Sequence, residues 1–447
     1  MLNKEERLSE ELPRKLGLFD GTLIVIGTII GSGIFLVPAQ IAGKVHSVVL
    51  IFLVWIAAGI LSFFGALSYS ELGAAFPKAG GLYVFIREAF GHLAGFLFGW
   101  ALFLVINTGS IATLAYAFSI YFGYLFPLSH FWIRIISIIA ILLLTAINCL
   151  GVRFGAFVQN LFGFLKTFAI FFIVFSAFFI GKGSFSNFLS SSGFISRNIL
   201  SDFGIAMIAA LWAYEGWHLV TFSAGEIKNP RKNLPFSLLL GTLFVIAVYL
   251  IANMAYLYIL PVDRIIHSEK VASVVMEEII GPGAGILISV AILISIYGAT
   301  NGLILTGPRV YYAMAKDRLF FKKAEFIHPK FRTPVYSIIL QGIWASFLIL
   351  IVGGFTELFT YTLFIGWIFY GMGALAVIAL RKKMPDLQRP YRTFGYPVVP
   401  LLFISGALFL VINTLIREPR NSLLGIFFVL SGFPVYYIWK IKKRKNI

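Results

Sequence analysis

The chain is a succession of long apolar stretches separated by short polar connections. Several stretches exceed the ~20 residues that a helix needs to cross the hydrocarbon core of a bilayer. Their spacing predicts about twelve transmembrane helices, centred near Ile30, Ile60, Phe103, Ile139, Phe172, Leu211, Val248, Leu293, Phe347, Trp367, Phe409 and Leu430. The predicted fold class is therefore all-α, a polytopic membrane protein without a separate soluble domain.

Two of these stretches are interrupted near their middle by residues that a lipid-facing helix avoids. The first carries GTIIGSGIF at 27–35, and the sixth carries WAYEGWH at 212–218. A freed backbone group or a carboxylate in lipid is costly, because no water is present to satisfy it. Such breaks persist where they line a cavity, and a pair of them in two halves of a chain indicates the substrate site of a secondary transporter.

The two breaks are expected at a similar depth, in helices that run in opposite directions. Gly31 lies about 20 Å from the start of the first span at helical rise, and Tyr214 and Glu215 approach the midplane from the other side. The second break follows the first by five spans, which predicts an inverted repeat of five plus five helices. The expected division is an N-terminal segment 1–17, a repeat core 18–382 with halves 18–181 and 202–382, two additional helices in 383–439, and a basic tail 440–447.

Composition and charge fit this interpretation. Hydrophobic residues make up 59% of the chain and charged residues 12%, whereas about a quarter of a soluble domain is charged. The net charge of +17 comes largely from basic residues in connections such as 309–332, 381–392 and 440–445. With a cytoplasmic N-terminus these connections are all cytoplasmic, which is the positive-inside distribution. The excess of positive charge therefore indicates membrane topology with both termini inside, and does not indicate nucleic-acid binding.

Cysteine and histidine are too sparse for a metal centre. Cys149 is the single cysteine, and His218 is the one histidine of six within a predicted span. A disulfide within the chain is excluded, and a membrane metalloenzyme is disfavoured because it needs clustered ligands. No nucleotide-binding motif is seen, so ATP coupling is not expected. We expect no metal, no cofactor and no enzymatic activity.

Several motifs, taken in their order, resemble the amino acid–polyamine–organocation superfamily and, within it, the L-type amino acid transporters. The matching segments are 27–35, SELG at 70–73 with PKAGG at 77–81, QNLF at 159–162 leading to Lys166, and 214–217 followed by GEIKNPRKNLP at 225–235. The resemblance covers nearly the whole chain. It implies the LeuT-like fold and amino acid transport.

The chain departs from this family in two places. Heteromeric animal members carry a cysteine between the third and fourth spans that binds an ancillary subunit, but FPLSH at 126–130 has none. The resemblance therefore implies a stand-alone permease of prokaryotic type in the cell membrane, without a disulfide-linked ancillary subunit. The second departure is the sixth span, with Glu215 where many members are neutral and Trp212 where phenylalanine is common, which leaves the substrate side chain open.

The unwound first span is expected to bind the α-carboxylate of an amino acid through the N–H groups that begin its second half. Carbonyl groups of both breaks carry the opposite partial charge and suit an α-ammonium. The alternative is that these glycines only permit close helix packing. The predicted substrate-binding residues are Thr28, Ile29, Ile30, Gly31, Ser32, Gly33, Trp212, Ala213, Tyr214 and Glu215.

Trp212 and Lys166 have specific predicted roles. By its match to the family's aromatic residue, Trp212 is expected to be a gate over the substrate, with core or lipid packing as the alternative. Lys166 is the one lysine predicted within the bilayer, where an isolated charge costs ~2.5–3.5 kcal/mol on insertion scales. By resemblance it stands where sodium-coupled relatives hold a cation, bridging the first and eighth spans. That position implies sodium-independent transport, and the alternative is a purely structural lysine.

The remaining candidates are less defined. Glu215 has three candidate roles, which are to carry a proton, to bind a substrate cation, or to cap the N–H groups that follow the break. His218 lies one turn past the break and is either a site residue or a packing residue. Ser295 and Tyr297 reach a similar depth on the eighth span, and their assignment to the site rests on depth alone.

Together these features predict a sodium-independent secondary carrier that exchanges neutral L-amino acids across the plasma membrane by alternating access. Two alternatives within the class are a proton-coupled amino acid symporter and a carrier of cationic amino acids or polyamines. A membrane-integral sensor is the alternative from another class. The expected partners are an amino acid substrate and the lipid bilayer, and no nucleic acid.

Overall fold

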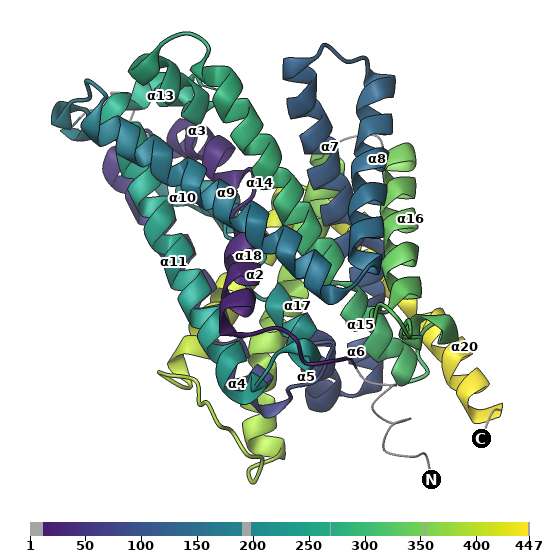
Figure 1. Cartoon of the computed structure of the whole chain (residues 1–447). Coiled ribbons are helices and arrows are strands. Elements are labelled where there is room, and N and C mark those ends of the chain that lie inside the picture. The colour runs from purple at the N-terminus through teal and green to yellow at the C-terminus, as the bar shows by residue number, and fades with distance from the viewer. Residues whose placement is uncertain (1–11, 190–197, 269, 353–354, 446–447) are drawn as a thin grey trace.

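A computed structural model describes residues 12–189, 198–268, 270–352 and 355–445. Regular structure in these ranges is helical (Figure 1). Nine of the described helices are long and apolar enough to cross a membrane, and a bent pair raises the number to ten. Two shorter apolar helices, Ile199–Ala213 and Val335–Ile351, occupy the places of the sixth and ninth predicted spans. The all-α, polytopic fold class is confirmed.

The predicted break in the first span is confirmed. Helix α2 (Leu18–Ile29) and helix α3 (Gly33–Val45) together form this span and meet at an angle of 43°. The sixth span is α10 (Ile199–Ala213), which gives way to a turn and then to the 3₁₀ segment η3 (Leu219–Glu226). In the second break Gly216 has φ +113°, a backbone conformation that glycine adopts readily.

The other spans are continuous or gently interrupted. They are α4 (Val48–Ala75), α6 (His92–Ala101) with α7 (Asn107–Leu125), α8 (His130–Cys149), α9 (Val152–Phe179), α11 (Pro230–Ile259), α14 (Ala284–Thr306) leading to α15 (Pro308–Lys316), α16 (Val335–Val352), α17 (Phe355–Lys383), α18 (Val398–Arg417), and α19 (Pro419–Leu430) with α20 (Gly432–Lys445). Short helices α5 (Leu82–Phe90), α12 (Val262–Ile266) and α13 (Val271–Ile280) lie at the ends of the bundle.

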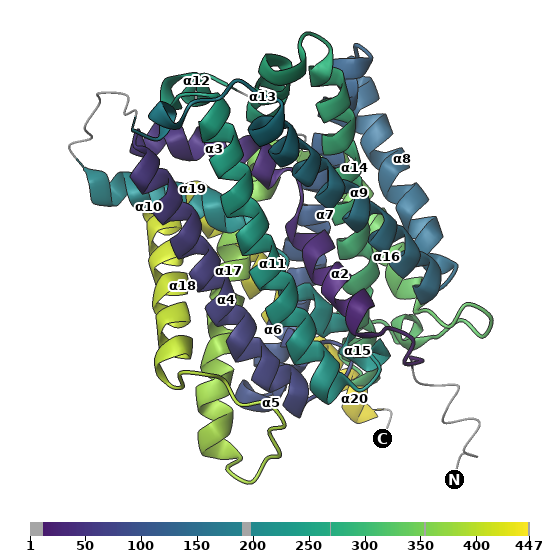
Figure 2. The ribbon, with the colours of Figure 1, turned by 60° about the vertical axis from the view of Figure 1, so that its left-hand side comes forward.

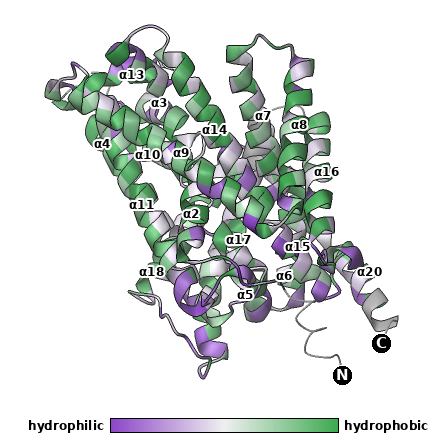
Figure 3. Cartoon of the chain, in the orientation of Figure 1, coloured by the Kyte–Doolittle hydropathy of each residue, from purple (hydrophilic) through white to green (hydrophobic). Residues whose placement is uncertain are grey.

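The helices pack around the two broken spans. Helix α11 lies against both α2 and α4, and α3 packs against α10 (Figure 2). Hydrophobic residues cover most of the helices, while hydrophilic residues gather near α5, α15 and α20 at one end (Figure 3). The described segment before α2 and helix α20 both lie toward this same end (Figure 1).

A fully buried ion pair lies near the polar end. The Nε atom of Arg309, at the start of α15, donates to Oε2 of Glu226 at 2.6 Å, and both side chains have no exposed surface. The backbone of Glu226 also accepts hydrogen bonds from Lys15 and Leu16 at 2.8 and 2.9 Å. This pair therefore ties the end of the sixth span to α15 and to the segment before α2.

Candidate functional site

The two broken spans meet at their interruptions. The hydroxyl of Thr28 donates to the backbone carbonyl of Gly216 at 3.0 Å. Gly216 has φ +113°, and a Cβ atom there would lie 2.8 Å from the carbonyl oxygen of Thr28. This position requires glycine for its backbone conformation and for the close approach, and the two breaks therefore share one depth in the bundle.

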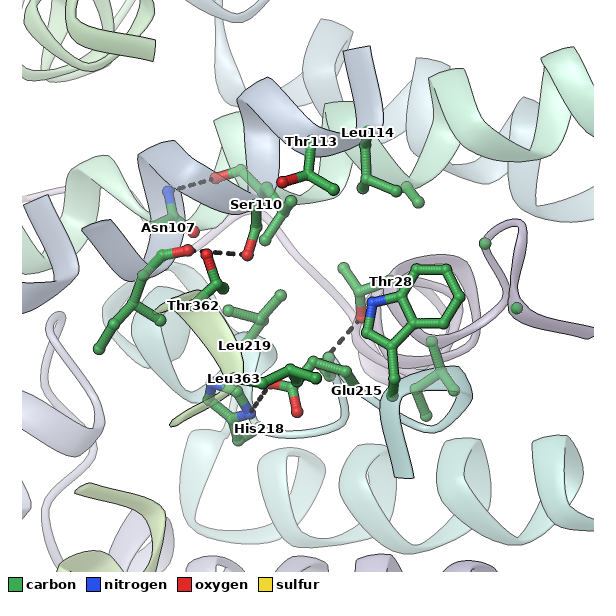
Figure 4. Close-up of a pocket in the computed structure, with 18 of the residues that line it drawn as sticks. Thr28, Asn107, Ser110, Thr113, Leu114, Glu215, His218, Leu219, Thr362 and Leu363 are labelled. Atoms are coloured by element: carbon green, nitrogen blue, oxygen red, sulfur yellow. Dashed lines mark hydrogen bonds and ion pairs between the residues drawn. The ribbon is translucent and has the colours of Figure 1, made fainter. Parts of the chain in front are cut away.

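A cavity lies between the breaks. Its empty volume, which includes open solvent at its mouth, is about 770 Å³. The residues that border it are Thr28, Ile29, Gly31, Ser32, Gly33, Leu102, Ile106, Asn107, Ser110, Thr113, Leu114, Trp212, Ala213, Glu215, Gly216, His218, Leu219, Ala299, Leu303, Thr362, Leu363 and Tyr370. Polar groups from α7 face those of the two breaks across it (Figure 4).

Lys166 satisfies the carbonyl groups that the first break sets free. Its Nζ atom is fully buried and donates to the carbonyl oxygens of Gly27 at 2.7 Å, Ile30 at 2.5 Å and Ser295 at 3.3 Å. These groups belong to α2, the break and α14. Because Lys166 itself lies on α9, its ammonium joins this helix to the first and eighth spans, the two spans that the family resemblance implies it bridges.

Other hydroxyl groups also donate hydrogen bonds to backbone carbonyls of the two breaks. Ser295 Oγ donates to the carbonyl of Gly31 at 2.9 Å. The Tyr249 hydroxyl, on α11, is placed between the carbonyls of Ile29 at 3.2 Å and Ala213 at 3.0 Å, one from each broken span. On the opposite side of the break, α3 begins at Gly33. The N–H groups in the first turn of a helix have no partners within the helix, and they therefore attract anions.

A carboxylate and an imidazole form another wall of the cavity. Glu215 Oε1 accepts a hydrogen bond of 2.8 Å from the Tyr370 hydroxyl, while its buried Oε2 has no hydrogen-bond partner among the described residues. His218 Nδ1 lies 3.8 Å from Glu215 Oε1, and in the same part of the chain neither ring nitrogen of His218 has a hydrogen-bond partner. The His218 ring packs on Tyr370 at a centroid distance of 4.4 Å. Buried polar atoms without partners are costly, and at a cavity wall they are available to a ligand.

Eight of the ten residues predicted to bind substrate border the cavity, namely Thr28, Ile29, Gly31, Ser32, Gly33, Trp212, Ala213 and Glu215. Ile30 and Tyr214 do not. The carbonyl of Ile30 is turned to Lys166, and Tyr214 is packed behind the break against Trp55 and Tyr249, at centroid distances of 5.8 and 5.1 Å. Trp212 is partly exposed, at the border of the cavity.

The less defined candidates differ in whether they line the cavity. His218 borders the cavity, whereas Ser295 and Tyr297 are not among its lining residues. Ser295 contacts the broken backbone from behind. The ring of Tyr297 instead packs between Phe118 and Phe162, each at a centroid distance of 5.4 Å. Depth along α14 located these residues, but the rotation of the helix turns Tyr297 away.

Gly33 has a packing role in addition to its place at the border of the cavity. A Cβ atom at this position would lie 2.7 Å from the Cβ of Ala213 and 2.8 Å from its Cα, so Gly33 is required for the packing of α3 on α10. A Cβ at Gly31 has its nearest neighbour, the Cβ of Ala299, at 3.7 Å. Close packing therefore requires glycine at position 33, whereas at position 31 the space beside the backbone belongs to the cavity.

Sequence reasoning missed one wall of the cavity. It consists of Asn107, Ser110, Thr113 and Leu114 on α7, joined by Thr362, Leu363 and Tyr370 on α17. A π-helical turn at Leu102–Ile106 precedes this wall, and such turns are frequent at functional sites. The signal that could have found the wall is the polar run NTGS at 107–110 within an otherwise apolar span.

A bundle of membrane-spanning helices with a cavity between two broken helices is typical of secondary transporters. The family model described as amino acid permease matches residues 16–438, and the chain belongs to this family. It is therefore a membrane transporter and not an enzyme.

Curated relatives cover almost the same length. The serine/threonine exchanger SteT of Bacillus subtilis is 37% identical over 97% of this chain and 98% of its own. The b(0,+)-type amino acid transporter 1 of Mus musculus is 32% identical over 97% of this chain and 89% of its own. The large neutral amino acids transporter small subunit 2 of Homo sapiens is 33% identical over 97% of this chain and 82% of its own.

Proposed function

We propose that this protein exchanges neutral L-amino acids across the plasma membrane, without sodium, by alternating access. The observation that carries the proposal is the position of the Lys166 ammonium, which occupies a cage of carbonyl oxygens from α2, the break and α14. A cation bound there would meet the same oxygens, which are ligands that hard cations prefer. The name of SteT as an exchanger supports the same mode of transport.

Within this proposal the substrate binds mainly through backbone groups. Its α-carboxylate accepts from the N–H groups around Gly31, Ser32 and Gly33, where the dipole of α3 adds to the hydrogen bonds. Its α-ammonium donates to carbonyls near Thr28, Ile29 and Ala213. Trp212 acts as the gate over the bound amino acid, since its side chain is partly exposed at the border of the cavity.

A second candidate function is transport of cationic amino acids. It is favoured by Glu215, whose Oε2 atom is buried at the cavity without a hydrogen-bond partner. A substrate ammonium or guanidinium would give this oxygen a charge-assisted partner. The Glu215→Gln variant tests it, because glutamine keeps an oxygen for Tyr370 but loses the charge. Uptake of L-lysine should then fall at least tenfold while L-serine uptake changes less than threefold, and equal effects on both substrates would contradict the cationic function.

We also propose the topology and assembly that fit this function. Both termini are cytoplasmic, and the chain divides into the segment 1–17, repeat halves at 18–181 and 202–382, additional helices within 383–439, and the tail 440–447. The connection between α7 and α8 contains no cysteine, which supports a prokaryotic, stand-alone carrier without a disulfide-linked subunit. Single accessible cysteines at either end, probed with an impermeant reagent, test this orientation.

The transport proposal is tested with purified protein in liposomes loaded with unlabelled L-serine. External labelled L-serine should enter at the same rate in choline and in sodium buffer, and much more slowly when the liposomes contain no amino acid. Loss of most uptake in choline would refute sodium independence. Strong acidification of a trapped pH dye during uptake into empty liposomes would favour proton symport, and binding without flux would favour a sensor.

A further inference from the structure

Three buried amide side chains form a chain of hydrogen bonds beside the site. Asn148 on α8, Asn301 on α14 and Gln159 on α9 are at most 1% exposed. Asn148 Nδ2 donates to Asn301 Oδ1 at 2.8 Å, and Asn301 Nδ2 donates to Gln159 Oε1 at 3.0 Å. The chain of hydrogen bonds therefore links α14 to the consecutive spans α8 and α9.

The direction of this chain is fixed by backbone carbonyls. Asn148 Nδ2 also donates to the carbonyl of Leu144 at 2.9 Å, and Asn301 Nδ2 also donates to the carbonyl of Gly155 at 3.1 Å. Each amide nitrogen must face a carbonyl, so the amides cannot be reversed one at a time. The chain consequently ends on Gln159 Nε2, a buried donor that has no hydrogen-bond partner in the described part of the protein.

Three glycines make room for the amides. A Cβ atom at Gly155 would lie 2.4 Å from Asn148 Oδ1, and a Cβ at Gly302 would lie 3.2 Å from Gln159 Nε2. A Cβ at Gly27, on α2, would lie 2.2 Å from the same Nε2 atom. The free donor of Gln159 is thus held directly against α2.

The Gln159 donor lies on the same face of α9 as Lys166 and contacts the same helix, α2. Gln159 precedes Lys166 by two helical turns on α9, so both side chains lie on one face of that helix. Gln159 abuts Gly27, and the carbonyl of Gly27 accepts the 2.7 Å hydrogen bond of Lys166. The neighbouring Asn160 donates to Asp20 Oδ1 on α2 at 2.9 Å. Residues 159, 160 and 166 therefore form a continuous contact of α9 with the first half of the broken span.

We infer that Asn301 and Gln159 are positioning residues that set the rate at which α2 changes orientation during transport. Asn301 holds Gln159 between α2 and α14, and Gln159 keeps α9 in the register in which Lys166 reaches the carbonyls of both helices. The free Nε2–H group is a donor for a carbonyl of α2 when that helix moves. Since neither residue borders the cavity, substrate affinity should depend on them weakly.

The inference rests on the proposed exchange and is tested with Asn301→Leu and Gln159→Met in liposomes loaded with L-serine. Each variant should lower the maximal rate of serine exchange about tenfold, per molecule that binds labelled serine, and change the half-saturating concentration less than twofold. The matched control is Ser137→Ala, which removes a buried hydrogen bond of 2.8 Å between α8 and Ser119 of α7. It should retain the wild-type rate, because it does not touch α2.

The outcomes separate this inference from the exchange function itself. If wild-type protein does not exchange serine or any other amino acid, the proposed function is wrong. If wild-type protein exchanges and both amide variants match Ser137→Ala, the positioning role is wrong. An increase in half-saturating concentration with an unchanged rate would also overturn it. Should Asn301→Leu fail to fold, Gln159→Met carries the test, since it leaves the bond between Asn148 and Asn301 in place.

Discussion

Replacing Lys166 by alanine removes the link between α9, α2 and α14 and leaves a small space in its place. The variant loses the hydrogen bonds to the carbonyls of Gly27, Ile30 and Ser295. Ser295 Oγ still lies 3.4 Å from the carbonyl of Ile30. The carbonyl of Gly27 loses its hydrogen bond from Lys166 and, among the described residues, has no such neighbouring hydroxyl to replace it.

The size of the effect follows from the two shorter hydrogen bonds. A hydrogen bond from a charged group contributes about 1.5–3 kcal/mol, so the two together stabilise the docked position of α2 by about 3–6 kcal/mol. Folding should suffer less, because burial of the ammonium costs several kcal/mol and offsets much of this gain. At 1.4 kcal/mol per factor of ten, even the lower value predicts a loss of exchange of roughly a hundredfold.

The assay is exchange of labelled L-serine by purified protein in liposomes, measured in choline and again in sodium buffer. Wild-type protein should not respond to sodium. Lys166→Ala should be about a hundredfold slower in choline and partly restored by sodium, because the vacated carbonyl cage is then open to a hard cation. Lys166→Met is the matched control, since its side chain fills the cage and should prevent the sodium effect.

Two results would refute this reasoning. Exchange by Lys166→Ala at more than a third of the wild-type rate would show that the link is not needed. A rate that is low but insensitive to sodium, together with a large fall in melting temperature, would show that Lys166 acts through folding and not as a substitute for a bound cation.

Three other predictions concern packing, gating and the buried ion pair. Gly33→Ala should destabilise the protein by about 1–3 kcal/mol because its methyl group meets Ala213. Gly31→Ala should leave the melting temperature within a few degrees of the wild-type value and still slow exchange. Equal melting temperatures for the two variants would contradict this prediction. Trp212→Ala should raise the half-saturating serine concentration at least fivefold with little change in thermal stability, and parallel losses would instead indicate packing. Arg309→Met should cost about 3–5 kcal/mol in unfolding experiments because it leaves Glu226 buried and unpaired, and the additional change Glu226→Gln should recover part of that loss.

Much of the fold followed from local properties of the chain. Span length and apolar composition predicted the helices, and GTIIGSGIF at 27–35 predicted the interruption between α2 and α3. Lys166 was assigned to a bridge between the first and eighth spans by resemblance, and its bonds to Gly27 and Ser295 join those spans. These features are visible in sequence because a helix break or a charge in an apolar span is costly wherever it occurs.

The residues that line the walls of the cavity could not be predicted from local properties of the sequence. Continuous spans such as α7 and α17 are apolar on most sides, since lipid and protein interior favour the same residues, and periodicity does not reveal which face is buried. Thr113 and Leu363 were therefore not predicted, and Tyr297 was placed at the right depth on a face that points elsewhere.

The membrane-spanning helices, the two breaks and the buried charge follow from the sequence alone, because each depends on the cost of placing particular groups in a bilayer. The side of each helix that faces the cavity, and the glycine that serves packing, depend on how the helices pack together. The same packing brings Asn148, Asn301 and Gln159 into one chain that ends at α2. These features depend on the rotation and close approach of helices far apart in sequence, which packing among all the spans fixes together.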